Sequence, residues 1–197
     1  MRLTTLQKTL WAAAGVATLA YGLLVLLPNR APEAVPQASF RPTFTLPDAE
    51  GHERTPSEFA GKHLLVFFGF TNCPDVCPTT LAEVAQVMDD LSDDAGKVQP
   101  LFISIDPERD RRLGLAEFTA AFHPSIIGLA GDEAQTRAAA DSFHIYYARE
   151  DDTAAPDGYT MSHSPALYLI SPDGDWLRQF SYGTPAAEIL SDLQSRL

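Results

Sequence analysis

The sequence predicts a single α/β sandwich domain that follows an apolar N-terminal segment. Short apolar runs, typical of buried strands, alternate with segments whose apolar residues recur every three or four positions, as on amphipathic helices. The chain then closes with a strand, a Ser-Pro-Asp-Gly turn, a second strand and a helix. Residues 40–197 are enough for one ordinary domain, and the sequence contains no internal repeat.

The first predicted element is a membrane anchor over residues 10–27, which carry no charge. At about 1.5 Å per residue this run spans about 27 Å, close to the hydrocarbon thickness of about 30 Å. Arg2 and Lys8 precede it and no acidic residue occurs before Glu33, so residues 1–9 should stay in the cytoplasm. A cleaved signal peptide is the alternative, but the run is longer than a usual signal core and no clear cleavage site follows.

This topology predicts a single-pass protein of the inner (cytoplasmic) membrane whose domain faces the periplasm or the cell exterior. Proline, alanine and polar residues without periodicity predict a linker over residues 28–39. The domain should begin near Phe40. Residues 44–48 together with Gly51 and His52 resemble the N-terminal β-hairpin that many extracytoplasmic thioredoxin-like domains add.

The strands and helices of the domain follow from local periodicity and turn signals. In order, they are strand 64–70, helix 78–91, strand 100–105, helix 113–122, strand 126–129, helix 133–142, strands 144–148, 166–170 and 176–182, and a last helix. Thr184 and Pro185 supply an N-cap and a first residue for that last helix. This order matches a thioredoxin-like sandwich.

The part of the chain beyond Arg30 is strongly acidic. It holds eleven basic and twenty-six acidic residues, a formal charge of −15. Such a charge keeps a domain soluble, argues against nucleic acid and anionic lipid surfaces as partners, and would steer a cation or a basic protein toward the domain.

The only two cysteines frame the motif Cys73-Pro74-Asp75-Val76-Cys77, between a predicted strand and a predicted helix. Both thiols should therefore lie in or just before the helix's first turn. Free backbone N–H groups and the helix dipole stabilise a thiolate there, the form that attacks disulfides and binds soft metals. A structural disulfide is the alternative, but so short a loop would contribute only about 2 kcal/mol, and a domain of this size builds a core without it.

A third candidate ligand lies in Met161-Ser162-His163-Ser164-Pro165. Thioredoxin-like folds carry a proline just before the strand beside the active-site helix, and Pro165 takes that place, so His163 should face the cysteines. Two thiolates and an imidazole suit copper better than magnesium or calcium, and structural zinc normally takes four protein ligands. Met161 is expected to pack, with weak metal ligation as the alternative.

Two acidic residues are candidates for supporting roles near the site. Asp75 is expected to stabilise the turn between the cysteines. The alternatives are an effect on the thiolates, contact with the outer shell of the metal, or a cap on the helix. Asp106 and Pro107 end the second long strand near the same sheet edge. We expect residues 108–112 to form the solvated start of a helix. Four further histidines share no ligand spacing and are expected at the surface or in caps: His52, His63, His123 and His144.

Three motifs together resemble the SCO/SenC family of membrane-anchored copper proteins. They are Phe67-Phe68-Gly69-Phe70-Thr71-Asn72-Cys73-Pro74-Asp75-Val76-Cys77-Pro78, Ser104-Ile105-Asp106-Pro107-Glu108-Arg109-Asp110, and His163-Ser164 before Tyr168-Leu169. The resemblance covers nearly the whole domain. Asn72, Ser162 and Pro165 stand where histidine, aspartate and a small or apolar residue are common. None of these departures removes a ligand, although Ser162 would alter hydrogen bonds that orient His163.

The resemblance implies that one copper ion, Cu(I) or Cu(II), is bound by Cys73, Cys77 and His163. Such proteins assist assembly of the dinuclear CuA centre in subunit II of cytochrome c oxidase, by delivering copper, by reducing the recipient cysteines, or by both. The family pattern also suggests that Asp106 shapes the site or docks a partner. Implied partners are the CuA domain, a thiol-disulfide reductant that keeps the cysteines reduced, and another periplasmic copper chaperone.

A metallochaperone rather than an enzyme is thus expected, and the main alternative is a membrane-anchored thiol-disulfide oxidoreductase that reduces the cysteines of the copper acceptor. That activity would need Cys73 and Cys77 but not His163. The spacing favours metal binding, because three residues separate the cysteines where typical thioredoxin-like reductases have two. A peroxiredoxin-type peroxidase is less consistent, because Phe70 stands where such enzymes place threonine or serine.

Overall fold

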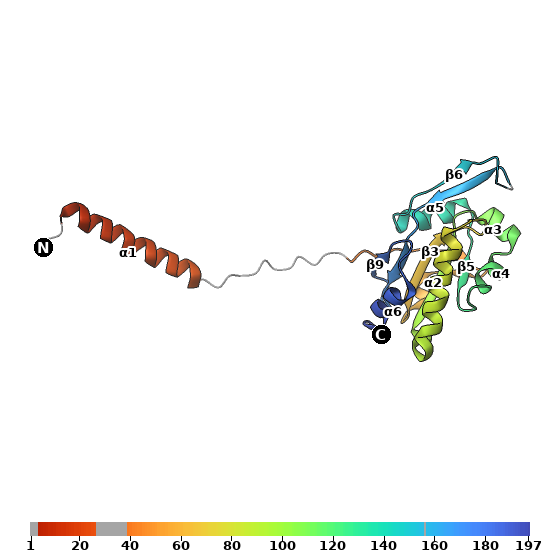
Figure 1. Ribbon diagram of the computed structural model, residues 1–197, viewed down its shortest axis with the longest axis horizontal. Helices are drawn as coiled ribbons and strands as arrows, with labels where there is room; N and C mark the ends of the chain where they lie inside the picture. Colours follow the sequence, from red (N-terminus) through yellow and green to blue (C-terminus); the bar gives the residue numbers. More distant parts are fainter. Residues whose placement is uncertain (1–3, 27–38, 156) are drawn as a thin grey trace. The chain divides into compact units, whose positions relative to one another are not determined.

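The computed structural model describes residues 4–26, 39–155 and 157–197. The chain divides into two units, and the second comprises Ser39–Leu197. The first unit contains helix α1 (Thr5–Leu26; Figure 1). No helix in the described residues is both long enough and apolar enough to cross a membrane, so the predicted span over residues 10–27 is not confirmed. Residues 1–3 of the predicted N-terminus, residue 27 and the predicted linker up to residue 38 lie outside the described part.

A five-stranded sheet forms the centre of the second unit, in the order β5-β4-β3-β8-β9. The strands are β3 (His63–Gly69), β4 (Val98–Ser104), β5 (Ile127–Leu129), β8 (Leu167–Ile170) and β9 (Trp176–Phe180). Strands β3, β4 and β5 run parallel to one another. Strand β8 runs antiparallel to β3, and β9 runs antiparallel to β8. Every residue of β3 and β4 is buried, as expected of strands covered on both faces.

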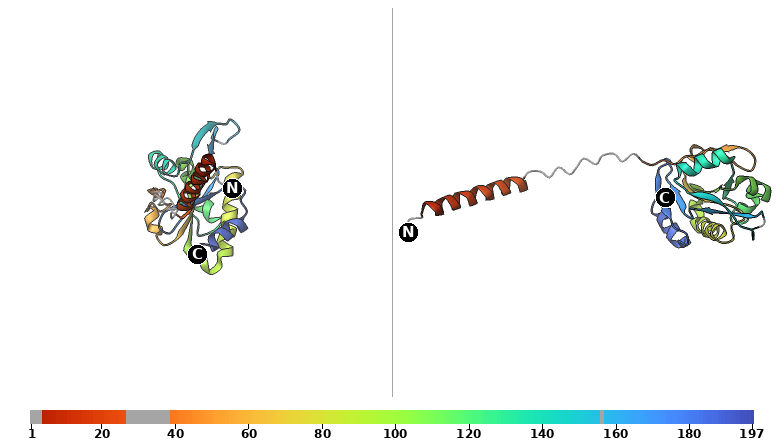
Figure 2. Two further views of the ribbon diagram at one scale, coloured as in Figure 1. Left: turned by 90° about the vertical axis from the view of Figure 1, so that its left-hand side faces the viewer. Right: turned by 90° about the horizontal axis from the view of Figure 1, so that it is seen from above.

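Helices cover the sheet on both sides (Figure 2). The helices are α2 (Val76–Leu91), α3 (Pro107–Leu113), α4 (Leu115–Ala120), α5 (Glu133–Ser142) and α6 (Ala186–Gln194). Helices α2 and α6 pack against each other, and α5 lies on the opposite side of the sheet. Phe68 of β3 packs edge-on against Phe143 beside α5, whereas its neighbour Gly69 faces α2. This α/β arrangement is the predicted thioredoxin-like fold.

The predicted N-terminal hairpin is present but short. It pairs β1 (Leu46–Pro47) with β2 (Glu53–Arg54) in antiparallel register, and a 3₁₀ turn, η1 (Pro56–Phe59), follows. The second 3₁₀ segment, η2 (Ser92–Lys97), connects α2 to β4. Leu46 is completely buried, so the hairpin closes one side of the core.

A separate two-stranded hairpin, β6 (Tyr147–Asp151) with β7 (Tyr159–His163), extends beyond the sheet (Figure 1). The prediction placed a strand over 144–148 and missed β7. His144 adopts a positive φ of 55°, which turns the chain out of α5 and delays the strand. Most residues of β6 and of the outer end of the hairpin are polar or exposed. The alternation of apolar and polar residues that identifies a strand is therefore weak in this part of the sequence.

Two expectations about the segment after β4 were wrong. The predicted helix 113–122 is shorter, α4 over Leu115–Ala120, because Gly114, with a φ of 82°, separates it from α3, which begins at Pro107 and ends at Leu113. The charged stretch 108–112 is not simply solvated, because Arg109 and Asp110 are buried with 2% and 0% of their surface exposed. Arg109 pairs with Asp106 at the start of its own helix, but its contact with Tyr159 and the contact of Asp110 with Thr71 come from distant parts of the chain that the local charge pattern does not reveal.

Candidate metal centre

The cysteine loop connects the end of β3 to the start of α2. The Cys73 N–H donates to the Phe70 carbonyl at 3.3 Å, which closes a turn directly after the strand. Asp75 occupies the N-cap position of α2 without a capping side-chain bond. Cys77 therefore lies in the first helical turn and is fully buried, whereas Cys73 precedes the helix and is half-buried.

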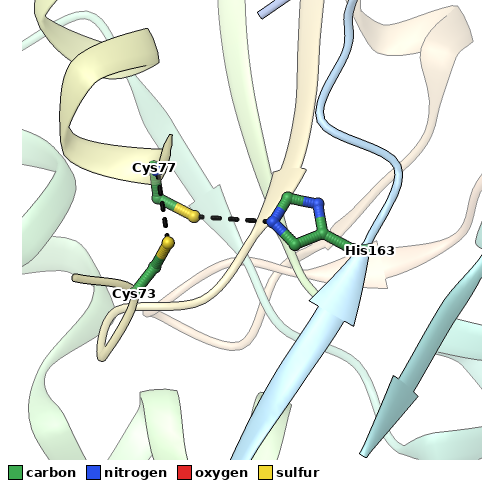
Figure 3. Close-up of side chains that lie close together, drawn as sticks. All are labelled: Cys73, Cys77 and His163. Atoms are coloured by element: carbon green, nitrogen blue, oxygen red, sulfur yellow. Dashed lines mark hydrogen bonds between the residues drawn. The ribbon is translucent and has the colours of Figure 1, made fainter. Parts of the chain in front are cut away.

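His163 reaches the cysteines from the last position of β7 (Figure 3). Its Nε2 lies 3.9 Å from the Cys77 Sγ, and the Cys77 backbone N–H donates to the Cys73 Sγ at 3.4 Å. The three ligand atoms all lie within 4.8 Å of one another. The structure thus brings together the three residues that the sequence singled out as metal ligands.

The hydrogen bonds of His163 determine which ring nitrogen is free. Nδ1 lies 3.1 Å from the Ser164 carbonyl, which can only accept, so Nδ1 carries the proton. The lone pair of Nε2 then faces Cys77 and is free for a metal. Phe67 and Phe70 pack edge-on against the ring, with centroids 5.9 and 6.1 Å away. Ser164 and Tyr146 exchange hydrogen bonds of 3.0 and 3.2 Å that hold the chain where it leaves β7.

The two sulfurs differ in acidity because they share one proton. A hydrogen bond with the Cys77 side chain lowers the pKa of Cys73 to about 4 against the opposing effect of burial, and hydrogen bonds with the His163 ring and with the Asp75 and Cys77 backbone N–H groups lower it further. The same hydrogen bond, together with burial, raises the pKa of Cys77. At neutral pH Cys73 is therefore a thiolate and Cys77 a thiol. Such a pair can attack a disulfide, or it can bind a soft metal once Cys77 loses its proton.

Gly69 is a functional residue that the sequence reasoning missed. A Cβ at this position would lie 2.7 Å from the Cys77 Sγ and 2.9 Å from Cε2 of Phe102, closer than real contacts allow. The absent side chain therefore creates the space that Cys77 occupies. A glycine inside an otherwise apolar strand was the available signal, because it often marks a close approach.

Asp110 also supports the site from an unexpected position. Its Oδ1 accepts hydrogen bonds from the Thr71 backbone N–H at 2.9 Å and the Thr71 hydroxyl at 2.7 Å, and its Oδ2 accepts one from Ser104 at 2.6 Å. Burial raises the pKa of the Asp110 carboxyl, and these hydrogen bonds oppose the rise. The cysteine loop is thus attached to the first turn of α3.

The other predicted candidates are not part of the three-residue group. Asp75 is exposed and accepts bonds from Tyr182 and Thr79 at 3.3 and 3.4 Å. Asp106 is buried and accepts from the Tyr159 hydroxyl. Met161 packs partly buried against the core, and Pro165 is exposed between β7 and β8.

The structure also groups Asp48, Glu50 and His52 at the tip of the N-terminal hairpin. The Asp48 carboxylate already accepts bonds from the Glu50 and His52 backbone N–H groups and from Arg54 at 2.8 Å. These contacts, in which a carboxylate stabilises a turn, account for the group without a metal.

Comparisons with known proteins agree with this geometry. Residues 32–197 match the family model described as SCO1/SenC. The mitochondrial SCO2 homolog of Bos taurus is 37% identical over 168 residues, which cover 84% of this chain and 63% of the bovine protein. This chain thus spans less than two thirds of that relative.

Solved structures are similar in fold as well. Bradyrhizobium japonicum ScoI with copper bound superposes with a TM-score of 0.72 at 35% identity, covering 81% of this chain and 100% of that one. BsSco, described as a member of the Sco family of cytochrome c oxidase assembly proteins, has a TM-score of 0.60 at 25% identity, covering 83% and 97%. The chain therefore belongs to the SCO1/SenC family.

Proposed function

We propose that this protein binds one copper ion through Cys73, Cys77 and His163 and assists assembly of the CuA centre in subunit II of cytochrome c oxidase. One observation carries the proposal. A thiolate, a thiol and a free imidazole nitrogen from a loop, a helix and a separate hairpin converge within 4.8 Å. Copper bound to a family member of the same fold supports the choice of metal.

The donor set fits copper by its chemistry. Thiolates favour Cu(I), and an imidazole also suits Cu(II). The Cys73 thiolate is available without losing a proton at neutral pH, whereas the proton of Cys77 must leave when its sulfur binds. The half-buried Cys73 lies at the accessible side of the site, so transfer would begin there, by exchange of its sulfur for a thiolate of the acceptor.

The acceptor we propose is the CuA domain of the oxidase. A reductant must keep Cys73 and Cys77 as thiols in an oxidising compartment, because a disulfide between them would remove both sulfur ligands. The copper would come from another copper chaperone. The formal charge of −15 beyond Arg30 would attract the cation and basic partner surfaces.

A second candidate function, reduction of the acceptor's cysteines, is favoured by the low pKa of Cys73. In that reaction the Cys73 thiolate attacks the disulfide of the acceptor and Cys77 resolves the mixed disulfide. The acceptor leaves with two thiols, and the pair here becomes a disulfide that an external dithiol must reduce. This activity needs no imidazole, so His163 separates the two functions.

We also propose that residues 10–27 hold the protein in a membrane with the domain on the outer side, as the uncharged run and the preceding basic residues predict.

Replacing His163 by alanine should weaken Cu(II) binding by more than about tenfold, since even the outer partners of metal ligands contribute that much. Cu(I), which the two sulfurs can hold, should be affected less. The measurements are copper stoichiometry, thiolate-to-copper absorption and competition titration, with His52→Ala as the matched control. Copper binding that is unchanged in His163→Ala, or lost in His52→Ala, would contradict the proposed ligands. Disulfide reduction without copper binding would favour the second function.

Cys73 should be alkylated by iodoacetamide at about pH 6, well before Cys77, because a thiolate is the reactive form. Its lowered pKa means that the rate should fall only as the pH approaches about 4. Mass spectrometry of the reduced, metal-free protein measures both sites, and Cys73→Ser identifies the reactive residue. Equal reaction of both cysteines, rising only near an ordinary thiol pKa of about 8.5, would disprove the shared-proton arrangement.

Gly69→Ala should reduce affinity for both copper oxidation states and lower the free energy of unfolding by about 1–3 kcal/mol, as overpacking does. The new methyl group would displace the Cys77 sulfur. Gly96→Ala is the matched control, since a Cβ there meets nothing within 4 Å. Denaturant unfolding and copper titration measure the two effects. Wild-type behaviour of Gly69→Ala in both assays would show that the close contact is not needed.

The anchor can be tested by cell fractionation. The full chain should remain with membranes after alkaline carbonate washing, and protease added to the outer side should digest the domain. A chain that lacks residues 1–27 should be released. Recovery of the full chain in the soluble fraction would rule the anchor out.

A further inference from the structure

The position of His163 depends on a hairpin that lies outside the central sheet. Among the described residues, β7 pairs only with β6, as a two-stranded sheet of its own. Backbone hydrogen bonds of the five-stranded sheet therefore do not fix the distance between β7 and the cysteine loop. The short connection from His163 to β8 supplies part of this restraint, and side-chain contacts along β7 supply the rest.

The strongest such contacts come from Arg109 in the first turn of α3. Its side chain is 99% buried, since only 1% of its surface is exposed, and its Nε lies 2.6 Å from the Asp106 carboxylate. Its Nη1 donates to the Tyr159 carbonyl at 3.2 Å, four residues before His163 on β7. The guanidinium carbon also lies 4.2 Å from the centre of the Tyr159 ring.

Further contacts complete the attachment of β7. The Tyr159 hydroxyl lies 3.1 Å from both oxygens of Asp106, so backbone, ring and hydroxyl of Tyr159 all meet the same ion pair. Arg149 of β6 covers the Tyr159 ring as well, at 3.5 Å. Toward the cysteines, the Arg109 guanidinium lies 5.6 Å from the Phe70 ring, which itself packs against His163.

The next residue, Asp110, holds the opposite side of the site through its two bonds to Thr71. Adjacent residues of one helical turn thus hold the two separate parts of the metal site, β7 and the cysteine loop. An exposed surface arginine would not need such partners, and an arginine is rarely this deeply buried unless it is paired.

We propose that Arg109, together with Asp106 and Tyr159, is a positioning group that holds the His163 imidazole at the cysteines and so sets the site's capacity for Cu(II). The inference rests on the proposed copper function. Cu(I) is held by the two sulfurs, whose loop is hydrogen-bonded through Thr71 to Asp110 rather than to Arg109. Cu(II) binding needs the imidazole, which Arg109 positions through β7.

The test uses the full chain with Arg109→Lys and Tyr159→Phe. Lysine keeps a positive charge beside Asp106 but loses the forked donor that reaches the Tyr159 carbonyl. Phenylalanine keeps the ring and removes only the hydroxyl. Arg111→Lys is the matched control, because Arg111 lies on the same helix and donates to the Ala130 and Gly131 carbonyls, away from β7.

Arg109→Lys should weaken Cu(II) binding by about 10–100-fold, the usual effect of removing outer partners of a ligand. Cu(I) affinity should stay within about threefold of the wild-type value, because both sulfur ligands remain in place. Tyr159→Phe should also weaken Cu(II) binding, but by a smaller factor. Arg111→Lys should bind Cu(I) and Cu(II) with wild-type affinity. In the metal-free reduced protein, the NMR signals of the His163 ring should shift in the first two variants only.

Wild-type Cu(II) affinity and an unshifted His163 signal in Arg109→Lys would overturn the proposal. An equal loss of affinity for Cu(I) and Cu(II) would also overturn it, because it would indicate general disruption of the site. If Arg109→Lys does not fold, Tyr159→Phe decides by the same criteria. If the wild type binds no copper, the proposed function fails, but the His163 signal in metal-free protein still tests the positioning separately.

Discussion

The direct contact between the first turn of α2 and the end of β3 sets the geometry on which the site depends. Gly69 lacks a Cβ, so the buried Cys77 sulfur packs against the strand itself. This contact places the sulfur beside Nε2 of His163 and beside Cys73. The shared proton and the thiolate on Cys73 follow from that closeness, whereas the free imidazole nitrogen follows from the hydrogen bond between Nδ1 and the Ser164 carbonyl. The thioredoxin-like sheet serves mainly to hold Gly69 and Cys77 at this short separation.

The second constraint is that a ligand on a separate hairpin must meet two ligands on the main fold. Two buried charged residues hold these ligands together. Arg109 and Asp110 lie beside carboxylate, carbonyl and hydroxyl partners. Buried ion pairs contribute little net stability, but breaking one by removing a single partner is strongly destabilising, so these contacts favour one arrangement of the hairpin. In a copper-binding protein such restriction matters because the oxidation state that is held depends on which ligands are within reach.

Much of the fold was predictable because its signals are local. The apolar run of β3 and the periodicity of α5 predicted those elements closely, and the cysteine motif with the distant His163 and Pro165 predicted the three site residues. Contacts between distant residues were not predictable. Strand β7 is too polar to stand out, the burial of Arg109 depends on Tyr159 fifty residues away, and the role of Gly69 appears only once α2 packs on β3.

The proposed function requires that two sulfurs and one imidazole of a single chain hold one copper ion. X-ray absorption spectroscopy of the full chain loaded with one equivalent of Cu(II) identifies the atoms bound to the metal. We expect two sulfur neighbours and an imidazole nitrogen with its characteristic outer-ring scattering. A copper surrounded only by nitrogen and oxygen, or by sulfurs without imidazole, would contradict it.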